Sequence, residues 1–136
     1  MTLVVDASIV FRWVFKSSSS AEARAVLRRS EPLIAPELII AELANAAWKT
    51  VQFEGFDPED ARRRLDDAID LLDEVVPCAS LADRAFEIAV DLRHAVYDCF
   101  YLALAEARSC RAATLDVRLA RRCGGTRYAT LLPETI

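Results

Sequence analysis

The sequence has few of the residues that zinc and redox sites require. It contains a single histidine, His94, and its four cysteines, Cys78, Cys99, Cys110 and Cys123, show no C-x-x-C spacing. Zinc sites typically use closely spaced Cys and His ligands, and disulfide frameworks are typical of short secreted chains with several cysteines. The sequence therefore predicts neither, and we expect reduced, mostly buried thiols. Lone histidines are more often structural than catalytic, so His94 is not a leading candidate for a general base.

Long apolar runs and glycine-rich phosphate loops are missing too. No run approaches the roughly 18 apolar residues that a membrane span needs. We therefore expect a cytoplasmic protein without a membrane partner. Neither GxGxxG nor GxxxxGK[ST] occurs, which excludes dinucleotide-binding and P-loop sites of those types. The net charge of −4 also argues against a protein that coats nucleic acid by bulk attraction.

The length of 136 residues fits one ordinary domain, and we treat residues 1–136 as a single domain. Hydrophobic residues make up 54% of the chain, above the usual share of about 45–50%. So short a chain cannot bury unlimited apolar surface. The surplus favours burial against a second copy or a partner, and we expect a homodimer.

Short apolar runs alternate with helical patterns along the chain. Strands are predicted at residues 3–5, 33–35, 75–76, 112–115 and 127–131. Helices are predicted at 9–15, 21–29, 36–53, from 57–58 onward, at 80–93 and 97–108, and after Asp116 as far as 124–125. The expected N-caps are Ser8, Ser20 and Ser80, and Gly55 is the expected stop of the long helix. Strands separated by helices, without hairpin turns, predict an α/β fold with a mostly parallel sheet flanked by helices.

Four of the 21 acidic residues interrupt apolar runs. Asp6 and Asp116 each follow a predicted strand, and binding crevices of parallel sheets lie at the carboxyl ends of strands. Glu42 lies within LIIAELANAAW and Asp98 within YDCFYLALAEA. A helix as apolar as the one around Glu42 is expected to be buried. A buried carboxylate needs a partner because its desolvation is costly.

A local structural role is an alternative for three of these acids. Asp98 and Asp116 are placed where helix caps occur, and Asp6 could shape a strand-to-helix turn. Glu42 is different, since it lies in the middle of a helix with no Lys or Arg within one turn. If the four acids converge, their repulsion requires a cation. Oxygen ligands without His or Cys favour Mg²⁺ or Mn²⁺, which implies a phosphodiester substrate.

Four motifs carry a resemblance to a known family. In order, VVDASIVFRW, PELIIAELANAAWK, YDCFYLALAEA and TLDVRLA resemble those of PIN-domain ribonucleases, and more narrowly those of VapC-type toxins. The likeness spans residues 3–131 and implies a PIN-like fold. It implies that the catalytic and metal-binding acids are Asp6, Glu42, Asp98 and Asp116, with Ser8, Asn45 and Thr114 as supporting polar groups. Cys99 stands where such proteins often carry alanine, a residue of similar size.

The resemblance also implies a mechanism. A cation held chiefly by Asp6 and Asp98, assisted by Glu42 and Asp116, would lower the pKa of a bound water, which would attack phosphorus in line. Products would carry 5′-phosphate and 3′-hydroxyl groups. The 2′-hydroxyl is not the nucleophile in this scheme, so selectivity for RNA would arise from shape and contacts.

Partners follow from the same resemblance: an RNA substrate such as tRNA or another structured RNA, a cognate antitoxin that inhibits the enzyme, and a second copy of the chain. All but two of the 17 basic residues are arginine. Arg12, Arg118, Arg121 and Arg122 lie near the acidic motifs and are candidates for phosphate contacts. The alternative is that they are ordinary solvated arginines on helix surfaces.

Two other functions are compatible with this fold class. A catalytically silent PIN-like binding module would lack at least one of the four acids, and all are present. Another Mg²⁺-dependent phosphate enzyme is the second alternative. Asp6-Ala7-Ser8 lacks the second aspartate of the usual phosphatase D-x-D motif, and no lysine is suitably placed for a phosphorylated receiver.

Overall fold

The computed structural model describes residues 1–132. Four short parallel strands form one sheet in the order β3-β2-β1-β4. They are β1 (Leu3–Val5), β2 (Leu33–Pro36), β3 (Glu74–Val76) and β4 (Arg111–Ala113). Leu3 pairs with Leu33 on one side and with Arg111 on the other. The predicted parallel sheet between helices is therefore confirmed.

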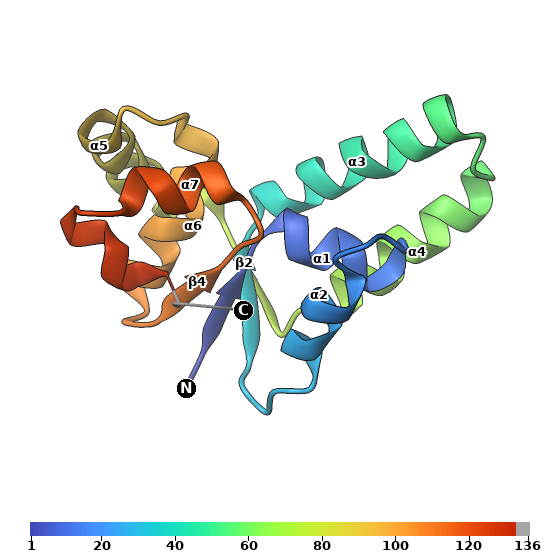
Figure 1. Cartoon of the computed structure of the whole chain (residues 1–136), viewed down its shortest axis with the longest axis horizontal. Helices are drawn as coiled ribbons and strands as arrows, with labels where there is room; N and C mark the ends of the chain where they lie inside the picture. Colours follow the sequence, from blue (N-terminus) through green and yellow to red (C-terminus); the bar gives the residue numbers. More distant parts are fainter. Residues whose placement is uncertain (133–136) are drawn as a thin grey trace.

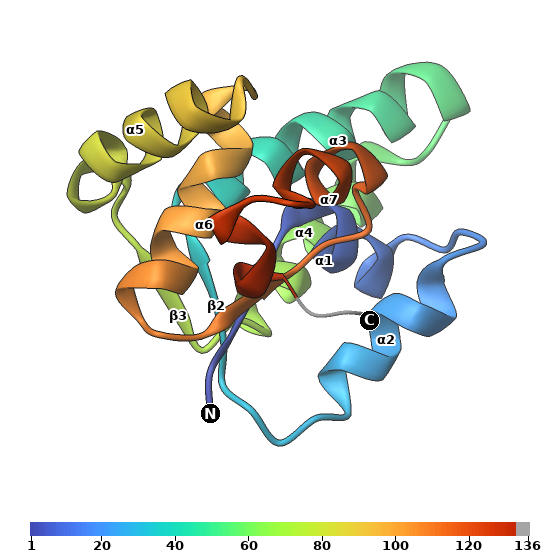
Figure 2. The same ribbon diagram turned by 60° about the vertical axis from the view of Figure 1, so that its left-hand side comes forward.

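Helices cover both faces of this sheet (Figure 1). On one side lie α1 (Ala7–Val14), α2 (Ser20–Leu27), α3 (Leu38–Glu54) and α4 (Pro58–Asp70). On the other lie α5 (Ala82–Leu92), α6 (Val96–Ala107) and α7 (Val117–Cys123), and the short 3-10 helices are η1 (Cys78–Ser80) and η2 (Arg127–Leu131). Helix α6 packs across β1, β2 and β4. Figure 2 shows α3 and α7 approaching each other above the carboxyl ends of the strands.

The core forms because β1 and β2 are apolar throughout, β3 and β4 are apolar after an exposed first residue, and the helices turn apolar faces toward the sheet. Val4, Val5 and Ile9 are fully buried near the centre of the sheet. Gly55 ends α3 in the left-handed conformation, with φ of 69°, as predicted. Asp57 caps α4 by accepting a hydrogen bond from the Asp60 amide, with Pro58 in the first turn. Cys99, Cys110 and Cys123 are buried free thiols, also as predicted.

The prediction of a fifth strand at residues 127–131 is wrong, because this segment is the helix η2. The Thr126 hydroxyl accepts a hydrogen bond from the Tyr128 amide and starts the helical turn. The Tyr128 side chain is buried, and its hydroxyl donates to Asp91 Oδ2 over 2.5 Å. This long-range contact overrides the strand propensity of the segment.

The predicted N-caps are also wrong. Asp6, not Ser8, caps α1 by accepting from the Ile9 amide. Ser20 lies inside α2, and its hydroxyl accepts from the Ser17 amide. Ser80 lies in η1 and donates to the Pro77 carbonyl. Serine competes for several local backbone partners, so its presence before an apolar pattern does not fix which amide it bonds.

The long helix begins later and is less buried than predicted. Pro36 belongs to β2, and α3 starts at Leu38. Only one stripe of α3 is buried, at Ile39, Leu43, Ala47 and Thr50. Trp48 and Phe53 are 51% and 73% exposed and stack edge to face on the outer surface. The apolar composition of α3 therefore exceeds what its contacts with the sheet and α4 can cover. No helix within residues 1–132 is both long and apolar enough to cross a membrane.

Candidate active site

Three carboxylates approach one another at the carboxyl end of the sheet. Asp6 follows β1 directly, Glu42 lies in the second turn of α3, and Asp98 lies in the first turn of α6. Their negative charges act on one another: Asp98 raises the pKa of Asp6, and both Asp98 and Asp6 raise that of Glu42. These three residues define what we call the acidic site.

Asp6 is the most buried member, with 9% of its surface exposed. Its Oδ1 accepts from the Ser8 hydroxyl over 2.5 Å and from the Ile9 amide over 3.3 Å, and its Oδ2 accepts from the Thr114 hydroxyl. Burial outweighs these hydrogen bonds and raises the pKa of Asp6 to about 6. Asp6 is thus a strongly oriented carboxylate whose negative charge is poorly stabilised by the protein.

Ser8 and Thr114 join two segments that are far apart in sequence. The Ser8 hydroxyl also accepts from the Leu115 amide over 3.0 Å, and the Thr114 hydroxyl accepts from the Asp116 amide over 2.9 Å. The start of α1 is thereby fastened to the loop after β4. Two of the three supporting residues that the resemblance implied, Ser8 and Thr114, thus contact Asp6 directly.

Glu42 is half-buried and receives a hydrogen bond of 2.5 Å at Oε1 from the Tyr101 hydroxyl. Tyr101 comes from α6 and is 2% exposed. Desolvation raises the pKa of Glu42, while the hydrogen bond opposes that rise. Burial and the charge of Glu42 raise the pKa of Tyr101, which keeps its hydroxyl protonated as a donor. The partner that a mid-helix glutamate required is therefore a neutral tyrosine.

Asp98 is bonded to the single histidine, since His94 Nε2 lies 2.6 Å from Asp98 Oδ2. An ionised carboxylate can only accept, so the imidazole is the donor. The His94 side chain is 12% exposed. Asp98 makes no capping bond, and the N-cap position of α6 is occupied by Ala95. Sequence reasoning treated His94 as structural, although its spacing of four residues from Asp98 was compatible with this contact.

Asp116 and Asn45 lie at the margins of the acidic site. Asp116 caps α7 by accepting from the Arg118 amide over 2.9 Å, so the predicted capping alternative holds for this residue. Its amide bonds Thr114, which connects it to Asp6 through one side chain. Asn45 is exposed and makes no side-chain hydrogen bond within residues 1–132.

Two pockets flank the acidic site. The first, which we call the arginine pocket, has a volume of about 520 Å³ and is lined by Arg93, His94, Ala95, Asp98, Asp116, Arg118, Arg121 and Arg122. The second has about 300 Å³ and is lined by Ala7, Ser8, Phe11, Arg12, Glu42, Asn45, Ala46 and Lys49. Arg12 donates from Nη1 to the Ser8 carbonyl over 2.6 Å, so part of its guanidinium is already committed to the protein.

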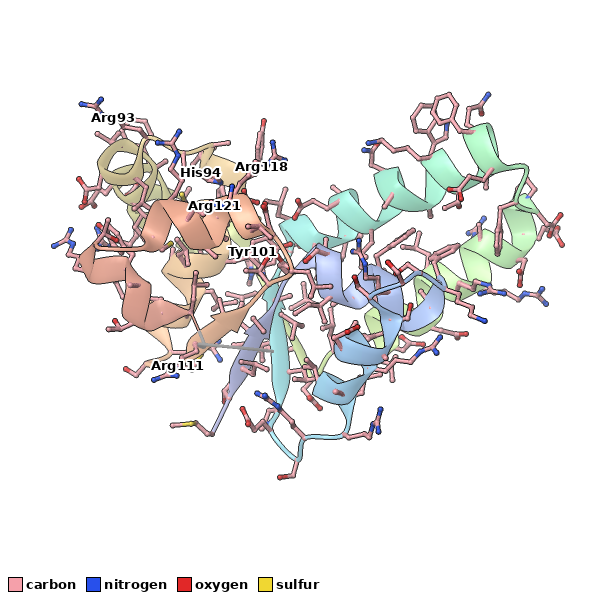
Figure 3. The ribbon with its side chains drawn as sticks, viewed as in Figure 1. Arg93, His94, Tyr101, Arg111, Arg118 and Arg121 are labelled. Atoms are coloured by element: carbon pink, nitrogen blue, oxygen red, sulfur yellow. The ribbon has the colours of Figure 1, made fainter. Side chains whose placement is uncertain are left out.

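A larger pocket, of about 640 Å³, lies at the opposite, amino end of the sheet beside Leu3 and Arg111. Figure 3 shows Arg111 far from His94 and Arg118. Its lining acids are Glu31 and Glu106, and Glu106 is already paired with Arg84 at 2.6 Å. Chemistry, and not volume, therefore locates the candidate active site at the carboxyl end, where parallel sheets bind ligands.

Within residues 1–132, no lysine or arginine forms an ion pair with Asp6, Glu42 or Asp98. Among those residues, the only ion pair of the acidic site is the contact between Asp98 and His94. No three Asp, Glu, His or Cys side chains in that part of the chain are close enough to form a ready-made cation cage. Mg²⁺ commonly binds through one or two carboxylates and keeps several waters. The oxygen-only donors and their unneutralised charge fit such an ion.

The known proteins that this chain resembles belong to one family. Residues 3–125 match the PIN domain model. Ribonuclease VapC9 of Mycobacterium tuberculosis is 32% identical over 117 residues, covering 86% of this chain and 87% of that protein. Ribonuclease VapC1 of the same organism is 36% identical over 124 residues, covering 89% and 90%.

Two solved structures share the fold. The crystal structure of PAE2754 from Pyrobaculum aerophilum has a TM-score of 0.72 at 24% identity, covering 93% of this chain and 82% of that one. The structure of VapBC2 from Rickettsia felis, bound to a DNA fragment from their promoter, has a TM-score of 0.64 at 15% identity, covering 93% and 96%.

Proposed function

The chain belongs to the PIN-domain family and to its VapC-type branch, and on this premise we propose that it is a metal-dependent endoribonuclease that hydrolyses RNA phosphodiester bonds. The family that the four acidic motifs predicted, and its fold, are confirmed. Similar proteins of this branch bear the name ribonuclease. The proposal extends that activity to this chain and specifies the residues that perform it.

One observation carries the proposal. Two of the carboxylates of the acidic site are held by uncharged hydroxyl groups, Asp6 by Ser8 and Thr114 and Glu42 by Tyr101, and Asp98 is bonded to His94. Hydroxyl groups orient carboxylate oxygens without cancelling their charge, whereas an arginine would do both. The protein thus maintains a concentrated negative charge in fixed positions, which suits cation binding and not structural stability.

Mg²⁺, with Mn²⁺ as a substitute, is the cation we propose, held chiefly by Asp6 and Asp98 with Glu42 and Asp116 assisting. When bound, it supplies Lewis acidity for phosphodiester hydrolysis. Oδ1 of Asp6 accepts two hydrogen bonds, from the Ser8 hydroxyl and the Ile9 amide, whereas Oδ2 accepts only from the Thr114 hydroxyl and so retains a further lone pair. Ser8 and Thr114 therefore orient Asp6 while leaving it able to bind.

Glu42 is the residue we assign to proton transfer. Its Oε1 is occupied by the Tyr101 hydroxyl, and no hydrogen bond within residues 1–132 occupies its Oε2. A carboxylate with a raised pKa is a better base than an ordinary one, and efficient general bases have pKa values closer to the working pH. Glu42 Oε2 would accept a proton from the attacking water, with Tyr101 holding the side chain in place.

The partners we propose are an RNA with secondary structure, such as tRNA, a cognate antitoxin and a second copy of the chain. The VapBC2 structure lends support through the paired name of the proteins it contains. Exposed apolar side chains on α3 and α5 supply surface for protein contacts, namely Ile40, Trp48, Phe53, Phe86 and Val90. Light scattering that detects only monomer would remove the homodimer from this proposal.

The decisive experiment incubates the purified chain with total tRNA and with a structured RNA, in Mg²⁺, in Mn²⁺ and in EDTA. We expect cleavage only with the divalent cations, and a loss of at least about 100-fold in Asp6→Asn and Asp98→Asn. Asp66→Asn, at an exposed position on α4, is the matched control and should cleave like the wild type. Equal cleavage by all of these proteins, or cleavage in EDTA, would overturn the proposal.

A further inference from the structure

The arginine pocket concentrates positive charge directly beside two of the catalytic acids. Its lining includes four arginines, Arg93, Arg118, Arg121 and Arg122, and two carboxylates, Asp98 and Asp116. We propose that this pocket binds a backbone phosphate of the RNA next to the phosphate that is cleaved. The inference rests on the proposed function and adds Arg93, which the sequence did not indicate, as a substrate-binding residue.

The arginines of this pocket are not committed to the protein itself. Within residues 1–132, the side chains of Arg93, Arg121 and Arg122 make no hydrogen bond or ion pair, and all three are exposed. Arg118 reaches Asp116 only at 4.0 Å. By contrast, Arg84, Arg108 and Arg127 each donate to a carboxylate at 3.0 Å or less. The pocket therefore holds guanidinium groups whose donors are available to a ligand.

The fold brings these side chains together from rigid supports. Helix α7 presents Arg118, Arg121 and Arg122, and it is anchored by its buried residues Leu119 and Cys123. Arg93 ends α5 at φ of 52°, a left-handed position that glycine occupies more easily. Figure 3 shows Arg93, His94, Arg118 and Arg121 at the same end of the molecule. The convergence thus depends on α5, α6 and α7 packing together.

Phosphate suits this pocket better than the carboxylates of an acidic protein segment do. Guanidinium forks bind phosphate oxygens in pairs and are weakly hydrated, which favours backbone contacts to nucleic acid. Asp98 and Asp116 on the same wall would repel a run of Asp or Glu side chains. A cation held by Asp98 and Asp116 would offset this repulsion for a phosphate, and without a cation the four arginines of the lining still outnumber its two carboxylates. A chain with net charge −4 also needs a local basic site to hold a polyanion.

The test measures binding separately from cleavage. A short fluorescein-labelled single-stranded RNA of mixed sequence is titrated with the full chain in EDTA, and anisotropy is followed over a range of NaCl concentrations. Each lost phosphate contact lowers the slope of log K against log salt by about 0.7. For Arg93→Gln/Arg121→Gln/Arg122→Gln we expect binding at least about tenfold weaker and a slope reduced by about 1 to 2.

The matched control is Arg24→Gln/Arg28→Gln/Arg62→Gln. It makes the same change in net charge at exposed arginines that lie outside the pocket and make no side-chain hydrogen bonds within residues 1–132. Both triple variants should melt like the wild type by circular dichroism. Equal weakening in both would mean that only overall charge matters, and no weakening in either would mean that the pocket does not touch RNA. Both results overturn the inference.

Two further results separate this inference from its neighbours. Competition by a poly-glutamate peptide as strong as that by unlabelled RNA would assign the pocket to a protein partner and overturn the RNA assignment. A wild type that cleaves no RNA, together with weaker binding in the pocket variant alone, would refute the proposed activity while supporting the phosphate site. Full cleavage by the wild type, together with unchanged RNA binding in the pocket variant, would support the proposed activity and refute the phosphate site.

Discussion

Carboxylates in two regions of this molecule experience opposite environments. On the outer surface of α5, α6 and η2, Glu106 receives hydrogen bonds from Arg84, and Asp91 receives them from Tyr128 and Arg127. These bonds lower the pKa of both carboxyl groups. In the acidic site the donors are neutral and burial dominates, so the pKa values of Asp6 and Glu42 are raised. We call the first region the paired surface.

The opposite pKa shifts distinguish carboxylates that stabilise the fold from carboxylates that are available to a ligand. A carboxylate paired with a guanidinium is stabilised as an anion but has little capacity left for a ligand. Asp6 and Glu42 in the acidic site are oriented by hydroxyl groups, which leave their negative charge in place. A site of this kind lowers the stability of the empty protein and recovers it when a cation binds.

The largest expected effect on stability comes from Asp6→Asn. The folded-state pKa of Asp6, about 6, exceeds its ordinary value of 3.8, so folding favours the protonated form. The stability that protonation of Asp6 gives the folded state is fully present below pH 3.8 and is lost as the pH rises through 6. The loss amounts to about 3 kcal/mol as an upper bound. The asparagine variant carries no charge and avoids it.

Urea unfolding in EDTA at pH 8 should therefore give a higher free energy of unfolding for Asp6→Asn than for the wild type. The difference in free energy of unfolding between the two proteins should be small near pH 4. At pH 8 it should narrow when Mg²⁺ is added, because the ion is expected to stabilise only the wild type. A variant that is less stable than the wild type at both pH values would contradict the assignment of Asp6 as a destabilising buried charge.

A smaller effect is expected when Tyr101 loses its hydroxyl. Tyr101→Phe leaves Glu42 half-buried without its donor, which costs about 1–3 kcal/mol for an unsatisfied group. The pKa of Glu42 should rise further, so the acidic limb of the pH–activity profile should move to higher pH. Tyr97→Phe is the control, since Tyr97 lies on the same helix but is 61% exposed. Identical pH profiles in both variants would exclude a positioning role for Tyr101.

The smallest effect is expected at the paired surface. Glu106→Gln weakens the contact with Arg84, but these side chains are 41% and 30% exposed, and solvent screens their attraction. We expect a loss of less than about 1 kcal/mol in thermal or urea unfolding, with RNA cleavage unchanged. Because the pKa of Glu106 is lowered, this stability is present above its ordinary pKa and is lost as the pH falls. A change in RNA cleavage in Glu106→Gln would contradict the separation of the paired surface from the acidic site.

Local patterns predicted much of the fold correctly. The apolar run before Asp6 gave β1, Gly55 ended α3, and Asp57 with Pro58 began α4, because each depends on near neighbours in the chain. The strand at residues 127–131 failed because Tyr128 is fixed by Asp91, which is 37 residues away. The expected burial of α3 failed because composition does not specify how much of a helix its neighbours can cover.

The sequence by itself determined which acids interrupt apolar segments and in what order they occur, and burying a carboxylate in such a segment is costly. Only the tertiary structure decided what surrounds them. Thr114 reaches Asp6 across 108 residues, and Tyr101 reaches Glu42 across 59. The arginine pocket likewise forms only where α5, α6 and α7 meet. Burial in the folded chain raises the pKa of Asp6 and Glu42, and chain-distant hydroxyl groups help to orient both, because electrostatic environment depends on distance in space and not on distance along the chain.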